Sequence, residues 1–372
     1  MTRVALVTYS TKPRGGVVHT LSLAEALCAL GADITVVALG DPAAGFFRAV
    51  DAPCVIVAAP PEAATLEERV FRSVDALAAG LSGLADRFDL FHTQDCIAAR
   101  AAVRVGRLPV LRTVHHVDDF TTPALVDCQR QAILEPDRVL VVSRHWQRLL
   151  RDEYGVEADV VPNGVDGRRF RGATPERRGA LRGRVGIDNG DGRFLFLAVG
   201  GIEPRKGSVH LLAALAAVQP AALAVVGGHS FQDYRAYREA ALASLPPSGL
   251  ELGRDVVLLG TVPDDELPAW YGAADALVFP SLKEGWGLAV LEAMSSGLPV
   301  IATDIPVFRE YLTHCHDALL VPPADPAALA AAMRSMMVDG ALRRRLAENG
   351  RAVAARYTWE ASARRHLTLY GG

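Results

Sequence analysis

The sequence predicts an α/β protein built from two doubly wound parallel-sheet domains in series. Short apolar runs of strand length alternate with segments of helical period, which is typical of βαβ units. The alternation stops after residue 161 and restarts at residue 194, so the pattern occurs twice. A chain of 372 residues, half of them apolar, is also long enough to bury two hydrophobic cores.

The first domain is expected over residues 1–162. Its strands are short apolar runs bounded by turn residues. The first of them, Val4–Thr8, precedes a loop KPRGG and a helix with apolar positions from Val17 onward. Ser143 is a suitable N-cap for a helix that carries Trp146. The other strands expected here are Ile34–Leu39, Cys54–Val57, Leu90–His92, Val110–Thr113, Val139–Val142 and Val160–Val161.

The second domain is expected over residues 163–357. Residues 162–193 are rich in Gly, Arg and Asp and contain no apolar run, so we interpret them as the linker and its entrance. A helical region is expected at Pro326–Arg356 and one last helix at Trp359–Tyr370. The strands expected in this domain are Phe194–Val199, Ala224–Val226, Val256–Leu259, Ala276–Phe279 and Pro299–Ala302.

Composition excludes several classes of protein. The formal net charge of −3 does not indicate a nucleic-acid-binding protein. No run reaches the ~18 apolar residues of a membrane span, and the N-terminus lacks the pattern of an export leader. Arg100, Arg104 and Arg107 recur near helical spacing, for which a solvated helix face is the expected explanation and peripheral membrane contact the alternative.

Cysteine usage indicates a reducing compartment. The five cysteines are odd in number, widely spaced and without a CxxC pair, so neither a disulfide framework nor a zinc site is expected. We therefore expect a cytoplasmic protein without a metal site. The cysteines are Cys28, Cys54, Cys96, Cys128 and Cys315.

The segment SLKEGWGLAVLEAMSSGLPVIATD, residues 281–304, carries the strongest chemical signal. It follows a strand, so Glu284 is expected in a loop at the carboxyl edge of a sheet and Glu292 on the helix behind it. Two such carboxylates can reach different hydroxyls of one elongated ligand. The glycines let the backbone approach that ligand, and the helix N-terminus offers N–H groups to a phosphate or hydroxyl. The alternative is a pair of solvated surface glutamates.

The segment VGGIEPRKG, residues 199–207, also follows a strand. Arg205 and Lys206 are adjacent cations just before a helix that starts near Ser208, and they suit two negatively charged phosphates. Lys206 is one of three lysines in a chain whose other basic residues are arginines, which favours a specific use of its ammonium. A basic surface turn is the alternative.

Two further patterns lie in the first domain. His115 and His116 end a strand, and because consecutive residues point to opposite sides, chelation of a metal by both rings is not expected. A hydrogen-bonding or proton-accepting histidine fits better, with a structural histidine as the alternative. Gly15 and Gly16 before the first helix are compatible with phosphate binding, but they do not form the GxGxxG pattern of a dehydrogenase.

In their order along the chain, these motifs resemble those of family 4 glycosyltransferases. The resemblance covers nearly the whole chain and rests on GGVVH, TVHH, SRHWQRLL, VPNGVD, EPRKG and EGWGLAVLEAMSSGLPVIATD. It implies the GT-B fold, in which two Rossmann-like doubly wound domains face a central cleft. It also implies a UDP-, GDP- or ADP-linked sugar as donor, a hydroxyl-bearing acceptor, retention of anomeric configuration, and neither metal nor other cofactor. The absence of an Asp-x-Asp motif fits metal independence.

The resemblance also implies roles for individual residues. Glu292 would bind the nucleotide ribose, Glu284 the hydroxyls of the transferred sugar, and Arg205 with Lys206 the departing diphosphate, where charge develops. Gly16 would approach the diphosphate, and a last helix in residues 358–372 would return to the first domain. His115 matches the family's catalytic-site histidine better than His116. Backbone contacts to the sugar, the β-phosphate or the base would come from Trp286, Gly287, Leu288, Gly260 and Val262.

One departure leaves the function open. The family usually has Gly-Arg where this chain has Gly200-Gly201, so a phosphate-binding arginine is absent, and only Arg205 lies near enough in sequence to replace its charge. The alternatives to a transferase are therefore a non-catalytic protein that binds sugar nucleotides and a sugar-nucleotide epimerase of the same fold. The sequence does not identify the sugar, the base, the acceptor or the oligomeric state.

Overall fold

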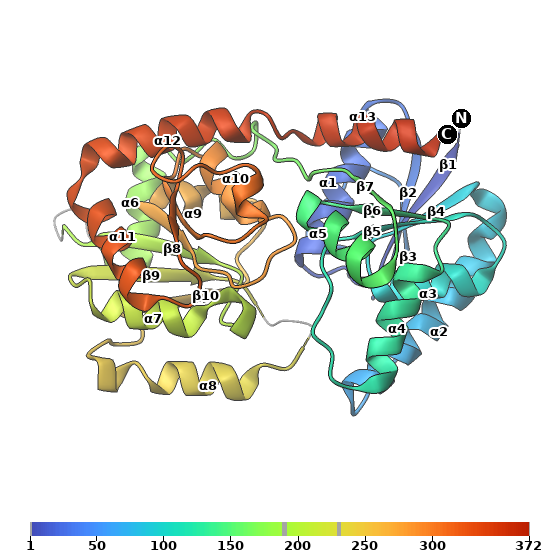
Figure 1. Ribbon diagram of the computed structural model, residues 1–372, viewed down its shortest axis with the longest axis horizontal. Coiled ribbons are helices and arrows are strands. Elements are labelled where there is room, and N and C mark those ends of the chain that lie inside the picture. Colours follow the sequence, from blue (N-terminus) through green and yellow to red (C-terminus); the bar gives the residue numbers. More distant parts are fainter. Residues whose placement is uncertain (1, 188–191, 229–231, 372) are drawn as a thin grey trace. The chain divides into compact units, whose positions relative to one another are not determined.

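The computed structural model describes residues 2–187, 192–228 and 232–371. The chain divides into two compact units, which are described separately here. Unit 1 contains Met1–Gly164 and Trp359–Gly372, and unit 2 contains Val165–Thr358. Figure 1 shows that helices flank the sheet of each unit.

Unit 1 is built around a parallel sheet. Among the described residues it has seven strands in the order β3-β2-β1-β4-β5-β6-β7. The strand order reverses between β1 and β4, which in doubly wound sheets marks the place where ligands bind. The strands are β1 Arg3–Thr8, β2 Asp33–Gly40, β3 Cys54–Ala58, β4 Leu90–Thr93, β5 Val110–Val114, β6 Arg138–Val141 and β7 Ala158–Val160.

The helices of unit 1 include the last helix of the chain, α13 Trp359–Tyr370. It lies against α1 Gly15–Ala29, the first helix (Figure 1). The contact is aromatic in part, because the rings of His19 and Trp359 meet edge to face at 5.4 Å. The other helices are α2 Leu66–Leu84, α3 Cys96–Val105, α4 Pro123–Leu134 and α5 Arg144–Leu149.

Unit 2 repeats the architecture. Its described residues form a six-stranded parallel sheet in the order β10-β9-β8-β11-β12-β13, which reverses between β8 and β11. The strands are β8 Phe194–Val199, β9 Ala221–Val226, β10 Val256–Gly260, β11 Ala276–Phe279, β12 Val300–Thr303 and β13 Leu319–Val321. The helices are α6 Pro175–Arg184, α7 Ser208–Ala216, α8 Arg235–Ala243, α9 Leu267–Ala273, α10 Leu288–Ser295, α11 Pro326–Val338 and α12 Gly340–Ala354.

The predicted fold class is confirmed, and the differences are local. The predicted linker is wrong over residues 175–187, because α6 and the turn after it bury Leu181 and Ile187 in unit 2. Residues 188–191 of that segment lie outside the described residues. The strand β13 was not expected from the sequence.

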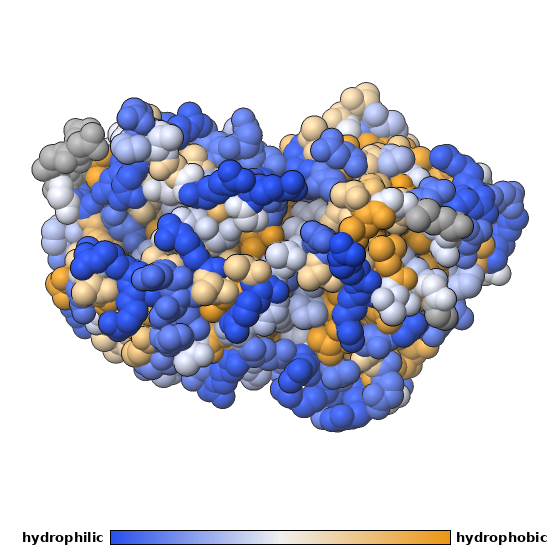
Figure 2. Space-filling model, turned by 90° about the horizontal axis from the view of Figure 1, so that it is seen from above, coloured by the Kyte–Doolittle hydropathy of each residue, from blue (hydrophilic) through white to orange (hydrophobic). Residues whose placement is uncertain are grey.

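The surface is mixed in character. Seen from the side of α12 and α13, hydrophilic side chains cover much of it and hydrophobic ones lie between them (Figure 2). Within the described ranges, no helix is both long and apolar enough to cross a membrane. The three arginines noted in the sequence form ion pairs: on α3, Arg100 contacts Glu135 and Arg104 contacts Asp75, and beyond its end Arg107 contacts Asp86.

Candidate functional site

The loops after β8 and β11 meet at the point where the strand order of unit 2 reverses. Because β8 and β11 are neighbouring parallel strands, both loops leave the same edge of the sheet. The Leu282 N–H donates to the Arg205 carbonyl oxygen at 2.8 Å, which joins the two loops through their backbones. The structure therefore brings together the two segments that sequence analysis singled out for chemistry.

The two loops place two cations beside two carboxylates. The Lys206 ammonium donates to Glu284 Oε1 at 2.6 Å, and Arg205 Nη1 lies 3.4 Å from the same oxygen. Arg205 Nε lies 3.3 Å from Glu203 Oε2. The side chains of Lys206 and Glu284 are 13% and 9% exposed, so their contact is shielded from water. Sequence analysis had not predicted that carboxylates partner these cations.

Burial and pairing act in opposite directions on these groups. Burial raises the pKa of Glu284, but the charges of Lys206 and Arg205 outweigh it, so its pKa lies below the ordinary value. Burial lowers the pKa of Lys206, and the Glu284 charge offsets only part of this. The Lys206 ammonium also lies 4.5 Å from the centroid of the Phe279 ring. These contacts hold the ammonium in a fixed position at the sheet edge.

The backbone conformation at Gly200 and Gly201 suits glycine, although the family resemblance implies Gly-Arg at these two positions. Gly201 has a φ of 77°, a conformation that side-chain-bearing residues rarely adopt. A Cβ on Gly201 would lie 3.0 Å from the Gly228 carbonyl oxygen, and a Cβ on Gly200 would lie 2.6 Å from Lys206 Cε. Lys206 thus occupies the space that a side chain on Gly200 would need, and the Gly228 carbonyl limits a side chain on Gly201.

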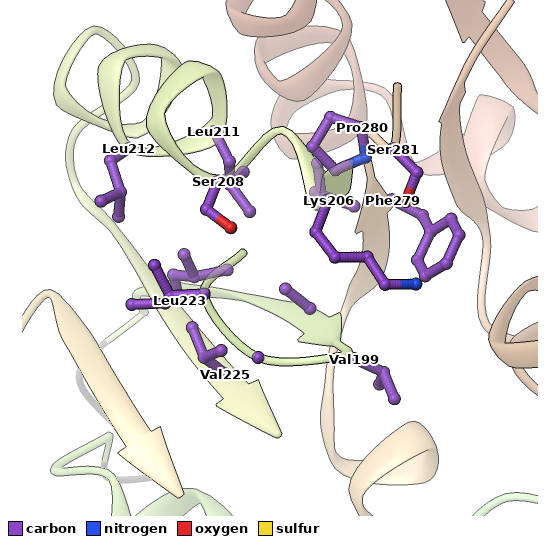
Figure 3. Close-up of a pocket in the computed structure, with 14 residues that line it drawn as sticks. Val199, Lys206, Ser208, Leu211, Leu212, Leu223, Val225, Phe279, Pro280 and Ser281 are labelled. Atoms are coloured by element: carbon purple, nitrogen blue, oxygen red, sulfur yellow. The ribbon is translucent and has the colours of Figure 1, made fainter. Parts of the chain in front are cut away.

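A small cavity lies beneath Lys206. Its volume is about 20 Å³, room for a water molecule but not for a sugar. Figure 3 shows Lys206, Phe279 and Ser281 on one side and Leu211, Leu212 and Leu223 on the other. It is a gap in the apolar interior of unit 2 beside the candidate site, and we do not interpret it as the donor pocket.

Glu292 lies on α10, the helix behind the second loop. It is 9% exposed, and the Tyr271 hydroxyl donates to its Oε2 at 2.6 Å. Burial raises the pKa of Glu292 above the ordinary value, although Tyr271 and Arg169 act against it. Tyr271 comes from α9 and was missed in the sequence, because its pairing with Glu292 depends on how two helices pack.

Trp286 has a different environment from the one expected. It is 3% exposed, and its ring stacks on Tyr311 at 4.9 Å and meets Tyr357 edge to face at 5.2 Å. The Tyr311 hydroxyl donates to the Trp286 carbonyl oxygen at 2.8 Å. Within the described residues the indole N–H has no hydrogen-bond partner. Trp286 therefore anchors the loop through aromatic packing.

The remaining predicted residues of unit 2 surround this centre. Gly287 has a φ of 92° and precedes the first residue of α10, Leu288. A Cβ on Gly287 would lie 2.6 Å from the Phe308 ring, so close packing against that ring requires glycine. Gly260 is the last residue of β10, the edge strand, and Val262 follows it; β9 separates β10 from β8.

In unit 1, Gly16 and His115 are neighbours. A Cβ on Gly16 would lie 3.8 Å from the His115 ring, and His115 Nε2 lies 3.3 Å from Gln94 Oε1. Burial lowers the pKa of His115 to about 3, with the charges of His116 and Arg112 adding to the effect. Such a neutral ring favours a hydrogen-bonding role over proton acceptance. His116 points elsewhere and contacts Asp118 at 3.3 Å.

Unit 1 also contains buried histidines that sequence analysis did not identify. His19, His92 and His366 are fully buried, and the rings of His19 and His115 meet at 4.5 Å. His19 Nδ1 lies 2.9 Å from Asn163 Oδ1, so Asn163 has a structural contact. Across the described residues, no group of three or more His, Cys, Asp or Glu side chains is arranged to hold a metal.

Two doubly wound parallel-sheet units, with candidate binding loops at the reversal of strand order in unit 2, are the architecture of the GT-B fold. The chain belongs to the family 4, group 1 glycosyltransferases and is an enzyme of that class. Residues 13–169 match the model described as Glycosyltransferase Family 4, and residues 184–353 match Glycosyl transferases group 1.

Relatives support this assignment at the level of whole domains. A D-inositol 3-phosphate glycosyltransferase of Frankia alni is 32% identical over 76% of this chain and 74% of its own length. An uncharacterised glycosyltransferase of Methanocaldococcus jannaschii is 24% identical over 99% of this chain and 97% of its own.

Solved structures share the fold. HepE of Anabaena, in complex with UDP and glucose, is 21% identical with a TM-score of 0.85, and the similarity covers 100% of both chains. Sucrose-phosphate synthase of Thermosynechococcus elongatus is 24% identical with a TM-score of 0.83 over 100% of this chain and 98% of that one.

Proposed function

We propose that this glycosyltransferase moves a hexosyl group from a nucleoside-diphosphate sugar to an acceptor hydroxyl with retention and without a metal. The observation that carries this proposal is the contact of Arg205 and Lys206 with Glu284 at the reversal point of the unit 2 sheet. Cations there can stabilise the charge that develops on a departing diphosphate. The carboxylate can accept hydrogen bonds from sugar hydroxyls.

Several roles belong to the same proposal. Glu292 would bind the ribose, the backbone at Trp286, Gly287 and Leu288 the sugar or β-phosphate, and the backbone at Gly260 and Val262 the base. Gly16 would approach the diphosphate, and His115 would act as a hydrogen-bonding partner of the substrate. In the proposed mechanism the acceptor attacks from the face that the diphosphate leaves, and the diphosphate oxygen takes the acceptor proton. We place this reaction in the cytoplasm.

The first experiment is a thermal-shift screen of UDP, GDP, ADP and TDP and their common sugars, each with and without magnesium. Saturation at 100 times Kd stabilises the native state by about 2.7 kcal/mol. The HepE complex makes UDP and UDP-glucose the first ligands to test. Stabilisation by one base, independent of magnesium, supports the proposal. The absence of a shift with every nucleotide would favour the non-catalytic alternative.

Turnover then tests the chemistry. Lys206→Ala is expected to lower the rate by about 10²- to 10³-fold, because a group aimed at developing charge is lost. Arg344→Ala, which removes an exposed cation of α12, is the matched control and should retain the wild-type rate. Unchanged turnover in Lys206→Ala, with the nucleotide bound, would refute the phosphate role.

The product distinguishes the enzyme classes. The anomeric configuration of the transferred sugar, read by nuclear magnetic resonance, tests retention directly. The relative from Frankia alni makes an inositol phosphate a reasonable acceptor to try first. An epimerase would convert the donor without consuming any acceptor, and a sugar-nucleotide-binding protein would bind the donor without turnover.

A further inference from the structure

Two of the five cysteines meet inside unit 1. Cys96 is the first residue of α3 and Cys128 lies on α4, and their sulfur atoms are 3.5 Å apart. They are separated by 32 positions in the chain, so the fold alone creates the pair. A disulfide needs a sulfur separation of about 2.05 Å, so an approach of roughly 1.5 Å would join them.

The other cysteines serve as a contrast. Cys54 and Cys315 are exposed, and the Cys54 thiol donates to the Ala52 carbonyl oxygen at 3.3 Å. Cys28 is half-buried on α1. Among the described residues, only Cys96 and Cys128 bring two sulfur atoms within hydrogen-bonding distance. Cys128 is 3% exposed, while Cys96 is half-buried, so solvent approaches the pair from the Cys96 side.

A buried arginine accompanies this pair. Arg112 on β5 is 4% exposed, and its Nη1 donates to the Ala132 carbonyl oxygen at 2.6 Å. Within the described ranges no carboxylate lies at ion-pair distance from it, and its Nε has no hydrogen-bond partner. The charges of Asp95 and Asp118 act on Arg112 from a longer distance, and a neighbouring thiolate would further reduce the cost of burying this cation. The charge of Arg112 acts on both Cys96 and Cys128.

Charge and hydrogen bonding favour a thiolate at this place. The hydrogen bond with Cys96 lowers the pKa of Cys128 to about 7 against the effect of burial, and the charges of Arg100 and Arg112 act in the same direction. Thiolates, not thiols, attack electrophiles, and an arginine environment is typical of reactive cysteines. The geometry and the electrostatics of the pair therefore agree.

Cys96 and Cys128 lie close in sequence to two glutamines that contact the loop carrying His115. Gln129, next to Cys128, accepts from the Asp118 N–H at 2.8 Å and donates to the Asp118 carbonyl oxygen at 3.0 Å. Gln94, two residues before Cys96, contacts His115. A movement that joins the two sulfurs would therefore pull on both side chains that hold this loop.

We propose that Cys96 and Cys128 are a redox-active dithiol that a peroxide converts to a disulfide. The thiolate sulfur of the pair attacks one oxygen of hydrogen peroxide, so an S–O bond forms, the O–O bond breaks and the hydroxide released takes a proton. The second thiol then attacks that sulfur, forming S–S and breaking S–O, and its proton leaves with the hydroxide as water. In sum, two thiols and one peroxide give one disulfide and two waters.

The test uses the full chain, treated with hydrogen peroxide and then denatured and alkylated. We expect the intact mass to fall by two hydrogen atoms and two cysteines to escape alkylation. Peptide mapping should find Cys96 linked to Cys128, and dithiothreitol should reverse the change. Hydrogen exchange of peptides over residues 115–120 should differ between the oxidised and reduced forms, because Gln94 and Gln129 hold that loop.

Variants separate the pair from general thiol oxidation. Cys96→Ser and Cys128→Ser should each abolish the loss of two hydrogens, while the control Cys54→Ser should retain it. Five alkylatable cysteines after peroxide, or a link that survives in Cys96→Ser, would overturn the proposal. If Cys128→Ser fails to fold, the mapping of the wild-type chain and the Cys96→Ser variant still decide the question.

Discussion

Acidification should destabilise unit 1 through its buried histidines. His19, His92 and His366 are each 0% exposed, and burial lowers the pKa of all three below the ordinary value. For His366 the pKa falls to about 4. His92 Nε2 lies 2.8 Å from Thr113 Oγ1 and its Nδ1 lies 2.7 Å from the Tyr370 hydroxyl, so both ring nitrogens have a hydrogen-bond partner.

The direction of the pH effect on stability depends on whether the folded or the unfolded chain binds protons at the higher pH. These folded pKa values are depressed, so between about pH 6.5 and pH 4 the unfolded chain binds protons that the folded chain does not. The stability is complete above that window and is lost as the pH falls. Each histidine contributes a slope of about 1.4 kcal/mol per pH unit, or about 4 kcal/mol for three. His115, whose pKa burial lowers to about 3, acts in the same direction, so the slope of the three fully buried rings is a minimum.

Asp95 acts in the opposite direction. Burial raises its folded pKa to about 6, so below that pH the folded state binds this proton before the unfolded state does. It therefore offsets about one histidine, and the net slope expected is about 3 kcal/mol per pH unit. Replacing His366 with asparagine removes one titrating ring while keeping an N–H donor for the Ser362 carbonyl oxygen, and the slope should fall by about 1.4 kcal/mol per pH unit.

Denaturant unfolding at several pH values, followed by hydrogen-exchange mass spectrometry, measures this slope, because peptides from unit 1 and unit 2 are separated. The control is His316→Asn, which changes an exposed histidine of unit 2 and should leave the slope of unit 1 unchanged. Equal slopes in wild type and His366→Asn would refute the reasoning. A loss of stability at low pH that is confined to unit 2 would also refute it.

Three further predictions test the candidate site. Gly201→Arg introduces the arginine that the family resemblance implies. It should lower Tm without raising donor affinity, because a side chain at this positive φ costs about 1–3 kcal/mol. Tighter donor binding in calorimetry would contradict this. Tyr271→Phe should cost about 1–3 kcal/mol and weaken nucleotide binding, because buried Glu292 loses its donor, and an unchanged Kd would argue against Glu292 as a ligand. His115→Asn should lower kcat by at least ~10-fold, because a side chain positioned beside the reacting group contributes substantially to the rate. The control His116→Asn should not lower it, and equal rates in both variants would exclude a special role for His115.

Most of the fold could be predicted because its signals are local and strong. The strands of both sheets are continuous apolar runs, and the structure confirms them to within a few residues. The exceptions are instructive. Three residues, Leu319–Val321, are too short a run to identify β13. The helix α6 has Leu181 as its buried side chain, and its arginines stabilise it from outside, since Arg178 and Arg182 both contact Asp275.

The site could be predicted only as far as topology determines it. Strand ends and the reversal of strand order bring the loops of Lys206 and Glu284 to one sheet edge, and this follows from the sequence pattern. The partners of those residues do not, because they depend on side-chain packing. Tyr271 beside Glu292 and Cys96 beside Cys128 are pairs that no spacing in the sequence indicates. The residue before a helix or the end of a strand can be read from sequence, but a contact between two helices cannot.

The charges of the unit 2 centre explain why these contacts matter. Glu203 and Glu284 together balance Arg205 and Lys206, so the formal charges of these four groups sum to zero. A diphosphate that approaches Lys206 must therefore compete with the Glu284 carboxylate, which already lies 2.6 Å from the ammonium. Once displaced, that carboxylate can accept hydrogen bonds from the hydroxyls of the attached sugar. A nucleotide sugar would compensate for the lost ion pair twice, with its diphosphate at Lys206 and its sugar hydroxyls at Glu284. A free diphosphate would compensate only at Lys206. The Lys206–Glu284 pair would then favour the intact donor over the departing diphosphate.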